Sequence, residues 1–579
     1  MRQPSGRGPW YGLIIILIIY AGLSLYQINL PGLHYDEAFE AVPALQLLLG
    51  QATTTFRGNG LSLGSQLFPL MTQDYIGAIN TYLAIPFIAT LGATPAALRV
   101  MSILIGATTI WLAFLLSYWL TGEHKVGLVA AVLLAVDPTF IFWNRQGIFV
   151  TAITATIGLA ATVSWLRRWQ TGTIGWSVAG AFFFGLGLYA KFLFIWLIAA
   201  LIGAVLLLNL ARLRPLISAG RNWLRHGRVE IVLIGLGFFA GCWPLVIYNL
   251  QTGGTWLNIS ENAQTSYYGV NNLAFGSNLL ERIHQFGTLL SSSQFWYLGR
   301  IITNPLPLIF FGLVLIGVVV ITILATRNHI RVSCNVPTQS SIWLRPHPFK
   351  VGLFPFLVIG LTILFSIGTV SALWLTHFAI LTPWPALAMA LGGWYIYHTL
   401  RLGGYEASKL STVVWLAIVL LVSTNLLTVG RYHQALTASG GLSSHSDAIY
   451  DLSGWLAQHA TGDVVAMDWG LAAPITYLTR GQVTPTEIFG YGWESNTELT
   501  SRLEKFIAEP GSLYLWRAPA EIIFDRSQEF KSLYRPRQLV ESIEAAFYER
   551  SGRPVLGVTR LVACGTADII TPEPPDHCR

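Results

Sequence analysis

The sequence predicts a mainly α-helical, polytopic membrane protein that ends in a small α/β domain. Hydrophobic residues make up 53% of the 579-residue chain, charged residues make up 11%, and the mean hydropathy is +0.55. These values are typical of membrane proteins rather than of water-soluble domains. Long apolar runs fill the chain up to about residue 430, after which they stop and charged residues become more frequent. We therefore expect a membrane domain over 1–430 and an α/β domain over 431–579.

Eleven apolar runs approach the length of about 20 residues that a membrane-spanning helix needs. They cover residues 11–30, 99–119, 126–143, 149–165, 174–190, 192–210, 230–248, 304–325, 351–367, 378–398 and 410–429. The run 75–91 is also apolar, but it is short and carries Asn80 and Pro86, so it fits either a span or a helix lying in the interface. The first run follows a basic segment, is about twice as long as a signal-peptide core and has no small-residue cleavage site after it. It is expected to stay as an anchor.

Basic residues between the runs indicate the topology, because cytoplasmic loops collect Lys and Arg. If 75–91 does not cross, sixteen basic residues up to Val429 lie inside and six lie outside; if it crosses, every later loop inverts. We therefore expect an interfacial helix at 75–91 within one external loop, 31–98, and a second long external loop at 249–303. The N-terminus is then cytoplasmic, in a multi-pass protein of the plasma membrane. The net charge of +7 follows from these loops, and no nucleic-acid partner is expected.

The last part of the chain has the pattern of a small α/β domain on the outer face. Strand-like segments at 463–468, 512–516 and 554–563 are separated by helix-like segments around 447–459, 472–479 and 538–549. Such a domain is either a solvated appendage without a catalytic role or a part that influences the choice of acceptor.

The predicted topology divides the cysteines into two groups. Cys242 lies within a span and Cys334 in a cytoplasmic loop, so neither is expected to form a disulfide. Cys564 and Cys578 both lie in the outer domain, where oxidising conditions permit disulfides. We expect these two to form a disulfide that fixes the C-terminal tail.

An acidic pair marks the point where the first span leaves the membrane. In the stretch PGLHYDEAFEA, residues 31–41, Asp36 and Glu37 are adjacent. Carboxylates at a bilayer edge are costly unless they have a function, although they could also simply mark the water boundary. The predicted topology brings further polar residues to the same face, namely Asp74, Arg145, Lys191 and His377.

Carboxylates and cations at one depth suit substitution at a sugar carbon that carries a phosphate leaving group. A carboxylate can take the proton of an acceptor hydroxyl, and fixed cations can offset charge on the departing phosphate. Each residue also has a simpler interpretation. Arg145 and Lys191 could reach to lipid headgroups, and His377 could cap a helix. The combination with the acidic pair favours the catalytic interpretation.

Several segments of the chain resemble the GT-C membrane glycosyltransferases. In chain order these are HYDEAFEA, ATPAALRVMSILIGATTIWLAFLLSYWLTG, FWNRQGIF, GLGLYAKF and HFAILTPWPALAMALGG. The group they resemble most is the protein O-mannosyltransferase and aminoarabinose (lipid A) transferase families. Each motif alone is weak, whereas their order and spacing are more specific. The resemblance covers about the first two-thirds of the chain.

The resemblance implies a hexosyl- or pentosyltransferase that uses a polyprenyl-phosphate sugar donor. It further implies transfer on the outer face with inversion at the sugar carbon. By the same resemblance Asp36 is the base, with Glu37 as its helper or substitute. Arg145 matches an arginine expected near the donor phosphate, and Lys191 and His377 match polar positions of that cavity more loosely.

One departure from the family pattern concerns metal binding. Relatives often have an acidic residue about five positions after the arginine, where this chain has Val150 followed by Thr151. This difference favours a site without a metal or another cofactor. If a divalent cation is bound, Asp36 and Asp74 are its expected ligands, and Asp74 is also the candidate second carboxylate. The sequence contains no Cys/His metal spacing and no nucleotide-binding Gly loop.

Two other classes of function fit the same topology. A transporter or flippase for a lipid-linked or small polar substrate is the main alternative, although charge is sparse in the later spans and no related half-repeats are evident. A non-catalytic envelope assembly protein is the other. The sequence does not identify the sugar, the carrier length or the acceptor, which could be a lipid, a glycan or a protein. Aromatic residues at 266–269 and 294–298 could stack on a sugar or form an interface belt.

Overall fold

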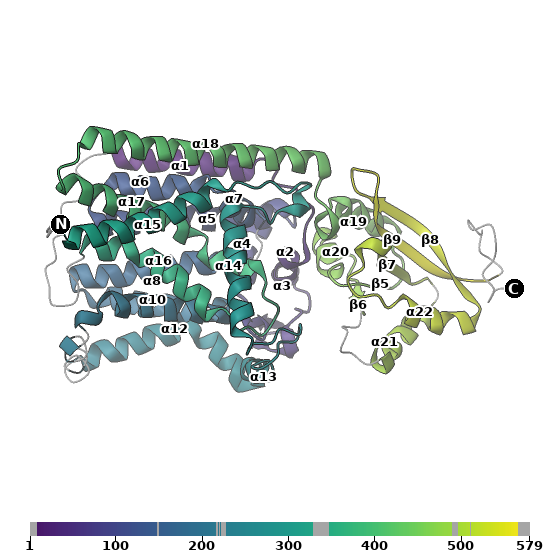
Figure 1. Ribbon diagram of the computed structural model, residues 1–579. Coiled ribbons are helices and arrows are strands. Elements are labelled where there is room, and N and C mark those ends of the chain that lie inside the picture. Colours follow the sequence, from purple (N-terminus) through teal and green to yellow (C-terminus); the bar gives the residue numbers. More distant parts are fainter. Residues whose placement is uncertain are drawn as a thin grey trace.

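The computed structural model describes residues 8–146, 150–212, 214–215, 218, 221, 227–327, 347–488, 496–509 and 511–564. Within these residues a bundle of long helices forms the larger part of the molecule, and a unit built on a five-stranded sheet forms the smaller part (Figure 1). The protein is therefore mainly helical and ends in a small α/β unit, as the sequence predicts.

Every predicted span coincides with a helix or with two consecutive helices. These are α1 (Gly8–Leu25), α5 (Pro95–Thr121), α6 with α7 (His124–Ala135, Pro138–Arg145), α8 (Val150–Thr171), α9 (Ile174–Ala190), η2 with α10 (Phe192–Phe194, Ile195–Leu208), α12 (Arg228–Thr252), α15 (Leu306–Arg327), α16 (Pro348–Phe365), η5 with α17 (Leu375–Leu381, Pro383–Leu402) and α18 (Ala407–Ser439). By length and hydropathy, six of the described helices could each cross a membrane, and eight spans result when each bent pair counts as one. The apolar segments 174–190 and 192–208 are shorter.

Local sequence explains where these helices begin, bend and end. The axes of α6 and α7 differ by 62°. At the bend, Asp137 accepts a hydrogen bond from the amide of Phe140 at 2.7 Å, and Pro138 occupies the first helical position. The helix α5 begins in the same way at Thr94 and Pro95 and ends at Gly122, whose φ of 76° suits glycine.

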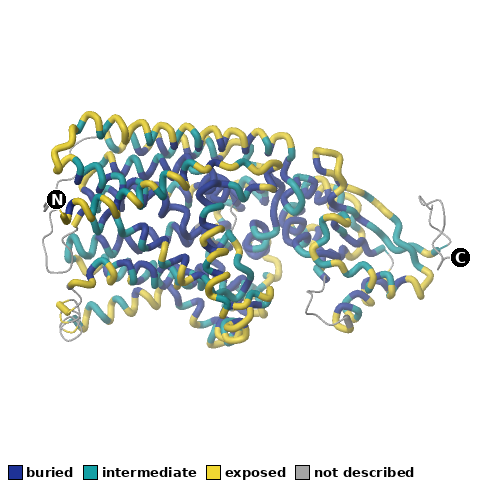
Figure 2. The backbone as a smooth tube through the Cα atoms, viewed as in Figure 1, coloured by how far each residue is buried: buried dark blue, intermediate teal, exposed yellow. Residues whose placement is uncertain are grey.

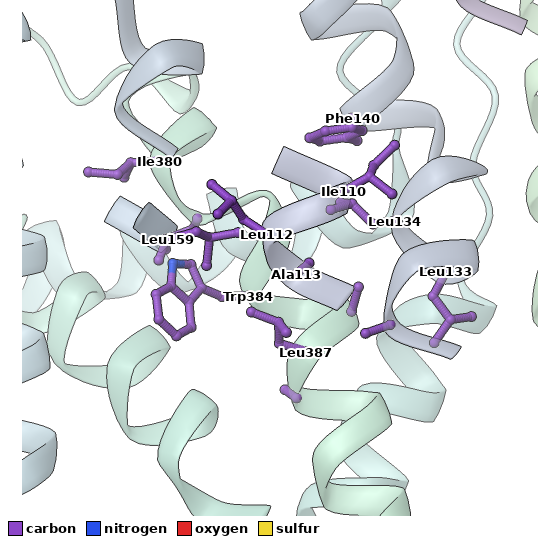
Figure 3. Packing of buried hydrophobic residues seen from close by; sticks show 14 of the residues in the cluster. Ile110, Leu112, Ala113, Leu133, Leu134, Phe140, Leu159, Ile380, Trp384 and Leu387 are labelled. Carbon is purple, nitrogen blue, oxygen red and sulfur yellow. The ribbon is translucent and has the colours of Figure 1, made fainter. Parts of the chain in front are cut away.

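The bundle has a buried apolar centre and an apolar outer surface. Side chains from α5, α6, α7, α8 and α17 pack together in the centre, where Trp384 lies against leucine and isoleucine side chains (Figure 3). The outer faces of α12, α15 and α18 are exposed (Figure 2) and carry large apolar residues such as Leu236, Leu313 and Leu416. An exposed apolar belt of this kind is what a lipid-facing surface requires.

The long loops gather at one end of the bundle, next to the C-terminal unit (Figure 1). The segment 31–98 forms α2 (Tyr35–Phe39), α3 (Ala41–Leu49), η1 (Phe56–Gly58), the antiparallel pairs β1–β2 (Gly60–Leu63, Gln66–Pro69) and β3–β4 (Met71–Gln73, Ile76–Gly77), and α4 (Ile79–Leu91). The segment 249–303 contributes α13 (Gly254–Glu261), α14 (Phe275–Ser291) and η4 (Trp296–Leu298). With 13 residues, α4 is shorter than a membrane span.

Backbone contacts tie these loops to one another. Lys191, between α9 and η2, forms an antiparallel bridge with Ile76. The amide of Tyr267 donates to the carbonyl of Val370 at 3.4 Å, and the amide of Leu442 donates to the carbonyl of Tyr297 at 2.8 Å. All the segments that the charge count assigns to the outer face therefore meet at one end of the bundle.

The C-terminal unit holds a mixed sheet with the strand order β6-β5-β7-β9-β8. Its elements are α19 (Ala448–His459), β5 (Val464–Ala466), α20 (Ala472–Leu478), β6 (Thr486–Glu487), α21 (Asn496–Ala508), β7 (Leu513–Arg517), α22 (Ser527–Tyr534), β8 (Leu539–Tyr548) and β9 (Pro554–Ala563). The strands β6, β5 and β7 are parallel, whereas β9 runs antiparallel to β7 and β8.

One predicted helix of this unit is wrong. The segment around 538–549 is strand β8, which pairs with β9 from Leu539 opposite Ala563 to Tyr548 opposite Pro554. Its leucine, glutamate and alanine residues favour a helix locally, but the pairing with β9 decides the outcome.

Only one cysteine of the predicted disulfide lies within the described residues. Cys242 is buried in α12 and free, as expected of a residue within a span. Cys564 follows β9, whereas Cys578 and Cys334 lie outside the described residues. The Cys564–Cys578 disulfide stays a prediction.

Candidate active site

The helix α2 places the acidic pair, and its first turn is fixed by histidine. His34 caps the helix by accepting a hydrogen bond from the amide of Asp36 at 3.2 Å. The His34 ring stacks on His445 with centroids 4.2 Å apart, and His445 stacks on Tyr297 at 4.0 Å. The C-terminal unit and the 249–303 loop therefore both contribute to holding the start of α2.

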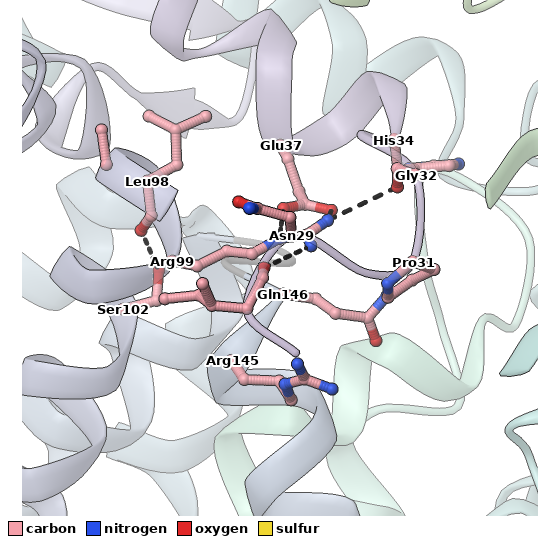
Figure 4. A network of polar contacts seen from close by, with 12 residues as sticks. Asn29, Pro31, Gly32, His34, Glu37, Leu98, Arg99, Ser102, Arg145 and Gln146 are labelled. Atoms are coloured by element: carbon pink, nitrogen blue, oxygen red, sulfur yellow. Dashed lines mark hydrogen bonds and ion pairs between the residues drawn. The ribbon is translucent and has the colours of Figure 1, made fainter. Parts of the chain in front are cut away.

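The structure gives Glu37 a different role from the expected helper or substitute base. Its two carboxylate oxygens accept hydrogen bonds from Arg99 at 2.9 and 3.0 Å, and neither side chain of this ion pair is exposed. Arg99 also donates to the carbonyls of Ile28 and Gly32 (Figure 4). Because both oxygens of Glu37 face Arg99, this carboxylate anchors α2 to α5.

Asp36 is separated from Glu37 and keeps partial access to solvent. Its side chain is 37% exposed, and one carboxylate oxygen lies 3.6 Å from Nδ1 of His34. Asp36, Glu37, Glu40 and Asn80 line a small cavity together with Ala84 and Ser102, and both oxygens of Glu37 are already bonded to Arg99. Of the acidic pair, Asp36 is thus the carboxylate that remains available to a substrate.

Lys191 faces the same region from the other side. It stands in extended backbone between α9 and η2, and the adjacent amide of Phe192 donates to the carbonyl of Tyr75 at 2.9 Å. Burial lowers the pKa of Lys191 to about 8, against the opposing effect of the nearby Asp36 and Glu40 carboxylates. The Lys191 ammonium group therefore lies close enough to the Asp36 and Glu40 carboxylates to interact with them electrostatically.

Glu40 is a site residue that the sequence reasoning missed. It lies four residues after Asp36 and is 9% exposed. Burial raises the pKa of Glu40 to about 8, while hydrogen bonds with Asn80 and Thr72 and the charge of Lys191 oppose the rise. The spacing of four residues from Asp36 was the available signal, because residues so spaced lie on the same face of a helix.

Asp74 is engaged elsewhere and is not a second carboxylate of this space. It accepts hydrogen bonds from Arg57 at 2.8 and 2.9 Å and from the hydroxyl of Tyr248 at 2.5 Å. These contacts fix the turn between β3 and β4 onto α12. Among the described residues, no group of three or more His, Cys, Asp and Glu side chains is arranged to hold a metal ion.

Arg145 contacts the end of α1 rather than an open cavity. Its fully buried guanidinium donates to the carbonyls of Ser24, Tyr26 and Gln27 at 3.1, 2.6 and 2.7 Å. Basic groups are favourable at such helix C-termini. Figure 4 shows Arg145 on α7, beside the Glu37–Arg99 pair. Only its Nη1 lacks a hydrogen-bond partner within the described part of the chain, so a phosphate contact through Arg145 would have to use this donor.

His377 lies near Lys191 and beside a further arginine. Nδ1 of His377 is 3.4 Å from Nη2 of Arg282, and its ring faces Trp196 with centroids 6.1 Å apart. Arg282 is fully buried and also donates to the carbonyls of Ser366 and Trp374 at 3.1 and 3.0 Å. His377 is buried, with 4% of its surface exposed, and it lies close enough to Lys191 to interact with it electrostatically.

Tyrosines from two loops complete the surroundings of Asp36. The hydroxyls of Tyr75 and Tyr267 are 3.1 Å apart, and the rings of Tyr267 and Tyr268 lie 4.7 Å apart. Burial raises the pKa of Tyr75 and Tyr268, and the nearby Asp36 charge adds to the rise. The aromatic residues at 266–269 thus lie near the acidic residue. The site therefore combines carboxylates, an ammonium group and tyrosine side chains.

A family model described as dolichyl-phosphate-mannose-protein mannosyltransferase matches residues 79–248. The matched region runs from α4 to α12 and contains Arg99, Arg145 and Lys191, whereas Asp36 precedes it. A comparison with curated proteins by sequence gives no match.

Solved structures resemble the chain over most of its length. The crystal structure of ArnT from Cupriavidus metallidurans bound to undecaprenyl phosphate has a TM-score of 0.55 at 11% identity and covers 98% of this chain and 100% of its own. The Archaeoglobus fulgidus oligosaccharyltransferase in the apo form has a TM-score of 0.48 at 12% identity, covering 89% and 70%. The mycobacterial arabinofuranosyltransferase AftD has a TM-score of 0.46 at 13% identity, covering 97% and 40%. The similarity to ArnT and the family-model match at residues 79–248 together show that this chain has the GT-C fold of membrane glycosyltransferases.

Proposed function

We propose that the protein transfers a sugar from a polyprenyl-phosphate donor to an acceptor hydroxyl, with Asp36 as the base and Lys191 at the donor phosphate. The observation that carries the proposal is that Asp36 borders a small cavity and lies within electrostatic range of Lys191, at the end of the bundle where the loops gather. The similarity to ArnT, whose structure contains undecaprenyl phosphate, supports a lipid-linked donor.

The proposed reaction is a single displacement. The acceptor oxygen attacks the anomeric carbon and gives its proton to Asp36, while the bond from that carbon to the phosphate oxygen breaks and the phosphate leaves with the electron pair. Attack from the face opposite the phosphate inverts the configuration. The Lys191 ammonium offsets the charge that collects on the leaving phosphate. Fixed cations stabilise such developing charge most strongly in a desolvated site.

Glu40 and His377 act as neighbours of Lys191 in this scheme. The neutral carboxyl of Glu40 donates or accepts hydrogen bonds without adding a second negative charge beside Asp36. The buried His377 contacts Arg282 and lies within electrostatic range of Lys191. The reaction as proposed uses no metal ion.

Transfer is proposed to take place on the outer face of the membrane. The loops that carry Asp36 and Lys191 meet at the same end as the C-terminal unit, and the excess of Lys and Arg belongs to loops at the other end. A polyprenyl-phosphate group would lie at the membrane interface beside this site.

The test is sugar transfer by the purified protein in liposomes. A radiolabelled polyprenyl-phosphate sugar pool and native membrane acceptors are supplied to the wild type, to Asp36→Asn and to Asp451→Asn, an exposed control carboxylate. We expect transfer by the wild type and the control, and a loss of at least about 100-fold in Asp36→Asn. Transfer that survives in Asp36→Asn contradicts the assigned base. If the wild type moves the donor across the bilayer without transfer, the protein is a transporter.

A further inference from the structure

A second, larger cavity lies between the membrane part and the C-terminal unit. Its volume is about 330 Å³. One wall comes from α2, α3 and the segment leading to β1, and the other comes from α20 and the residues before β6. The lining includes Tyr35, Phe39, Arg57, Thr72, Thr484 and Glu487. A volume of this size is in the range of small-ligand sites.

The charged groups at this cavity are already neutralised within the protein. Arg57 is paired with Asp74. One oxygen of Glu487 accepts hydrogen bonds from the amides of Gly470, Leu471 and Ala472 at 3.1, 3.1 and 3.0 Å. The remaining polar lining consists of hydroxyl and amide groups. A neutral polar ligand therefore fits the cavity better than a phosphate or a carboxylate, which would need a free cation.

Aromatic rings form the apolar part of the lining. Tyr35 and Phe39 occupy one face of α2 and stack with centroids 5.2 Å apart. Trp469 from the C-terminal unit packs against Tyr35 at 4.6 Å, which fixes the Tyr35 ring between the two parts of the molecule. Preorganised ring faces beside hydroxyl groups suit the alternating C–H faces and hydroxyl edges of a sugar.

We propose that this cavity binds a neutral saccharide, which is the acceptor of the reaction. The identification of this saccharide as the acceptor rests on the proposed function. The binding of a saccharide in the cavity does not depend on it. The acceptor class is then a glycan rather than a protein segment or an anionic lipid headgroup.

The geometry of α2 connects the cavity to the proposed base. Tyr35 and Phe39 lie on the cavity face. Asp36 directly follows Tyr35, and Glu40 directly follows Phe39. One residue corresponds to a rotation of about 100° around a helix axis. Thr72 lines the cavity, and its Oγ1 lies 3.5 Å from Oε1 of Glu40. A saccharide that reaches Thr72 therefore ends next to Glu40, which lines the smaller cavity together with Asp36.

The test measures binding without requiring catalysis. Neutral gluco-, manno-, galacto- and arabino-oligosaccharides of four to six units are titrated into the full-length protein in detergent, and binding is detected by saturation-transfer NMR. Thr484→Trp fills the cavity from an exposed position, and Thr461→Trp is the matched control on an exposed loop away from the cavity. We expect at least one oligosaccharide to bind the wild type and Thr461→Trp equally, and at least tenfold more weakly to Thr484→Trp.

Two results overturn the inference. One is that no neutral oligosaccharide binds the wild type, while a Ser/Thr peptide or an anionic oligosaccharide binds in a manner that Thr484→Trp blocks. The other is that Thr484→Trp binds the saccharide as the wild type does. Asp36→Asn separates the two proposals, because it is expected to keep saccharide binding. If Asp36→Asn still transfers sugar, the assigned base is wrong, although the cavity still binds its saccharide.

Discussion

At the residue scale, the charge on Lys191 is the property on which the proposed chemistry depends. Its buried ammonium has a pKa lowered to about 8, so that the charge is present below this pH and is lost above it. Sugar transfer is therefore expected to fall as the pH rises through about 8. Lys191→Met is expected to lower turnover about 100-fold at pH 7, since it removes the cation at the leaving group. A pH–rate profile and turnover at saturating donor measure both effects.

A variant of Glu40 tests whether Lys191 is the group that causes this fall in activity at high pH. Asp36 and Glu40 both raise the pKa of Lys191, and the buried His377 and Arg282 lie on its other side. The pKa of Glu40 is itself raised to about 8, so this carboxyl gains its negative charge over the same pH range in which Lys191 loses its proton. In Glu40→Gln that charge is absent, so the fall in activity is expected at lower pH than in the wild type. Glu261→Gln, on the exposed end of α13, is the control. If activity falls at the same pH in the wild type, in Glu40→Gln and in Glu261→Gln, a group other than Lys191 causes the fall.

The sequence could predict part of this site because the information is local or follows from topology. Asp36 and Lys191 were expected on one face, and in the structure they lie close enough to interact electrostatically. The partners of Glu37 and Asp74 could not be predicted in the same way. Arg99 follows Glu37 by 62 positions, and Tyr248 follows Asp74 by 174. Only the packed helices bring these groups together, and the pairing occupies the oxygens of both carboxylates.

At the element scale, the Glu37–Arg99 ion pair is expected to hold α2 on α5. Glu37→Gln leaves the Arg99 charge buried without its partner, and breaking such a pair costs about 3–5 kcal/mol. We therefore expect a clearly lower apparent melting temperature in detergent. Glu406→Gln, which removes the exposed pair with Lys409, is expected to leave it unchanged. The double variant Glu37→Gln/Arg99→Met should recover part of the loss, and the absence of recovery would show that the pair is not the cause.

The elements also show where sequence patterns are sufficient and where they fail. The bundle helices were predictable because a long apolar run in a membrane protein has few alternatives to a helix. The strand β8 was not, since Leu539, Glu541, Ala545 and Ala546 are acceptable in either state and nine residues of β9 provide the pairing. The breaks within spans are caused by helix caps and prolines, such as Asp137 and Pro138. These residues lie inside long apolar runs, so the runs alone predict unbroken helices.

At the scale of the whole molecule, the C-terminal unit covers the end of the bundle that holds the site. The amide of Gly32 donates to the carbonyl of His445 at 2.8 Å, and the hydroxyls of Tyr450 and Tyr477 donate to the carbonyls of Asn29 and Thr94 at 2.7 and 3.1 Å. The unit thus contacts both ends of the segment that carries α2. Its contribution to the larger cavity follows from this docking, and the sequence alone could not have placed it there.

The same arrangement leads to a prediction about orientation in the membrane. Leu63 and Tyr405 are 64% and 63% exposed and lie in the β1–β2 hairpin and in the α17–α18 turn, at opposite ends of the bundle. The loop charges predict that the hairpin end faces outward, because Lys and Arg are concentrated in the loops at the other end. In intact cells carrying a protein with Cys564 and Cys578 changed to Ser, an impermeant thiol reagent should label Leu63→Cys but not Tyr405→Cys. Permeabilised cells should show labelling of both, which controls for accessibility. Labelling of Tyr405→Cys alone in intact cells would invert the topology, and the proposed site would then face the cytoplasm.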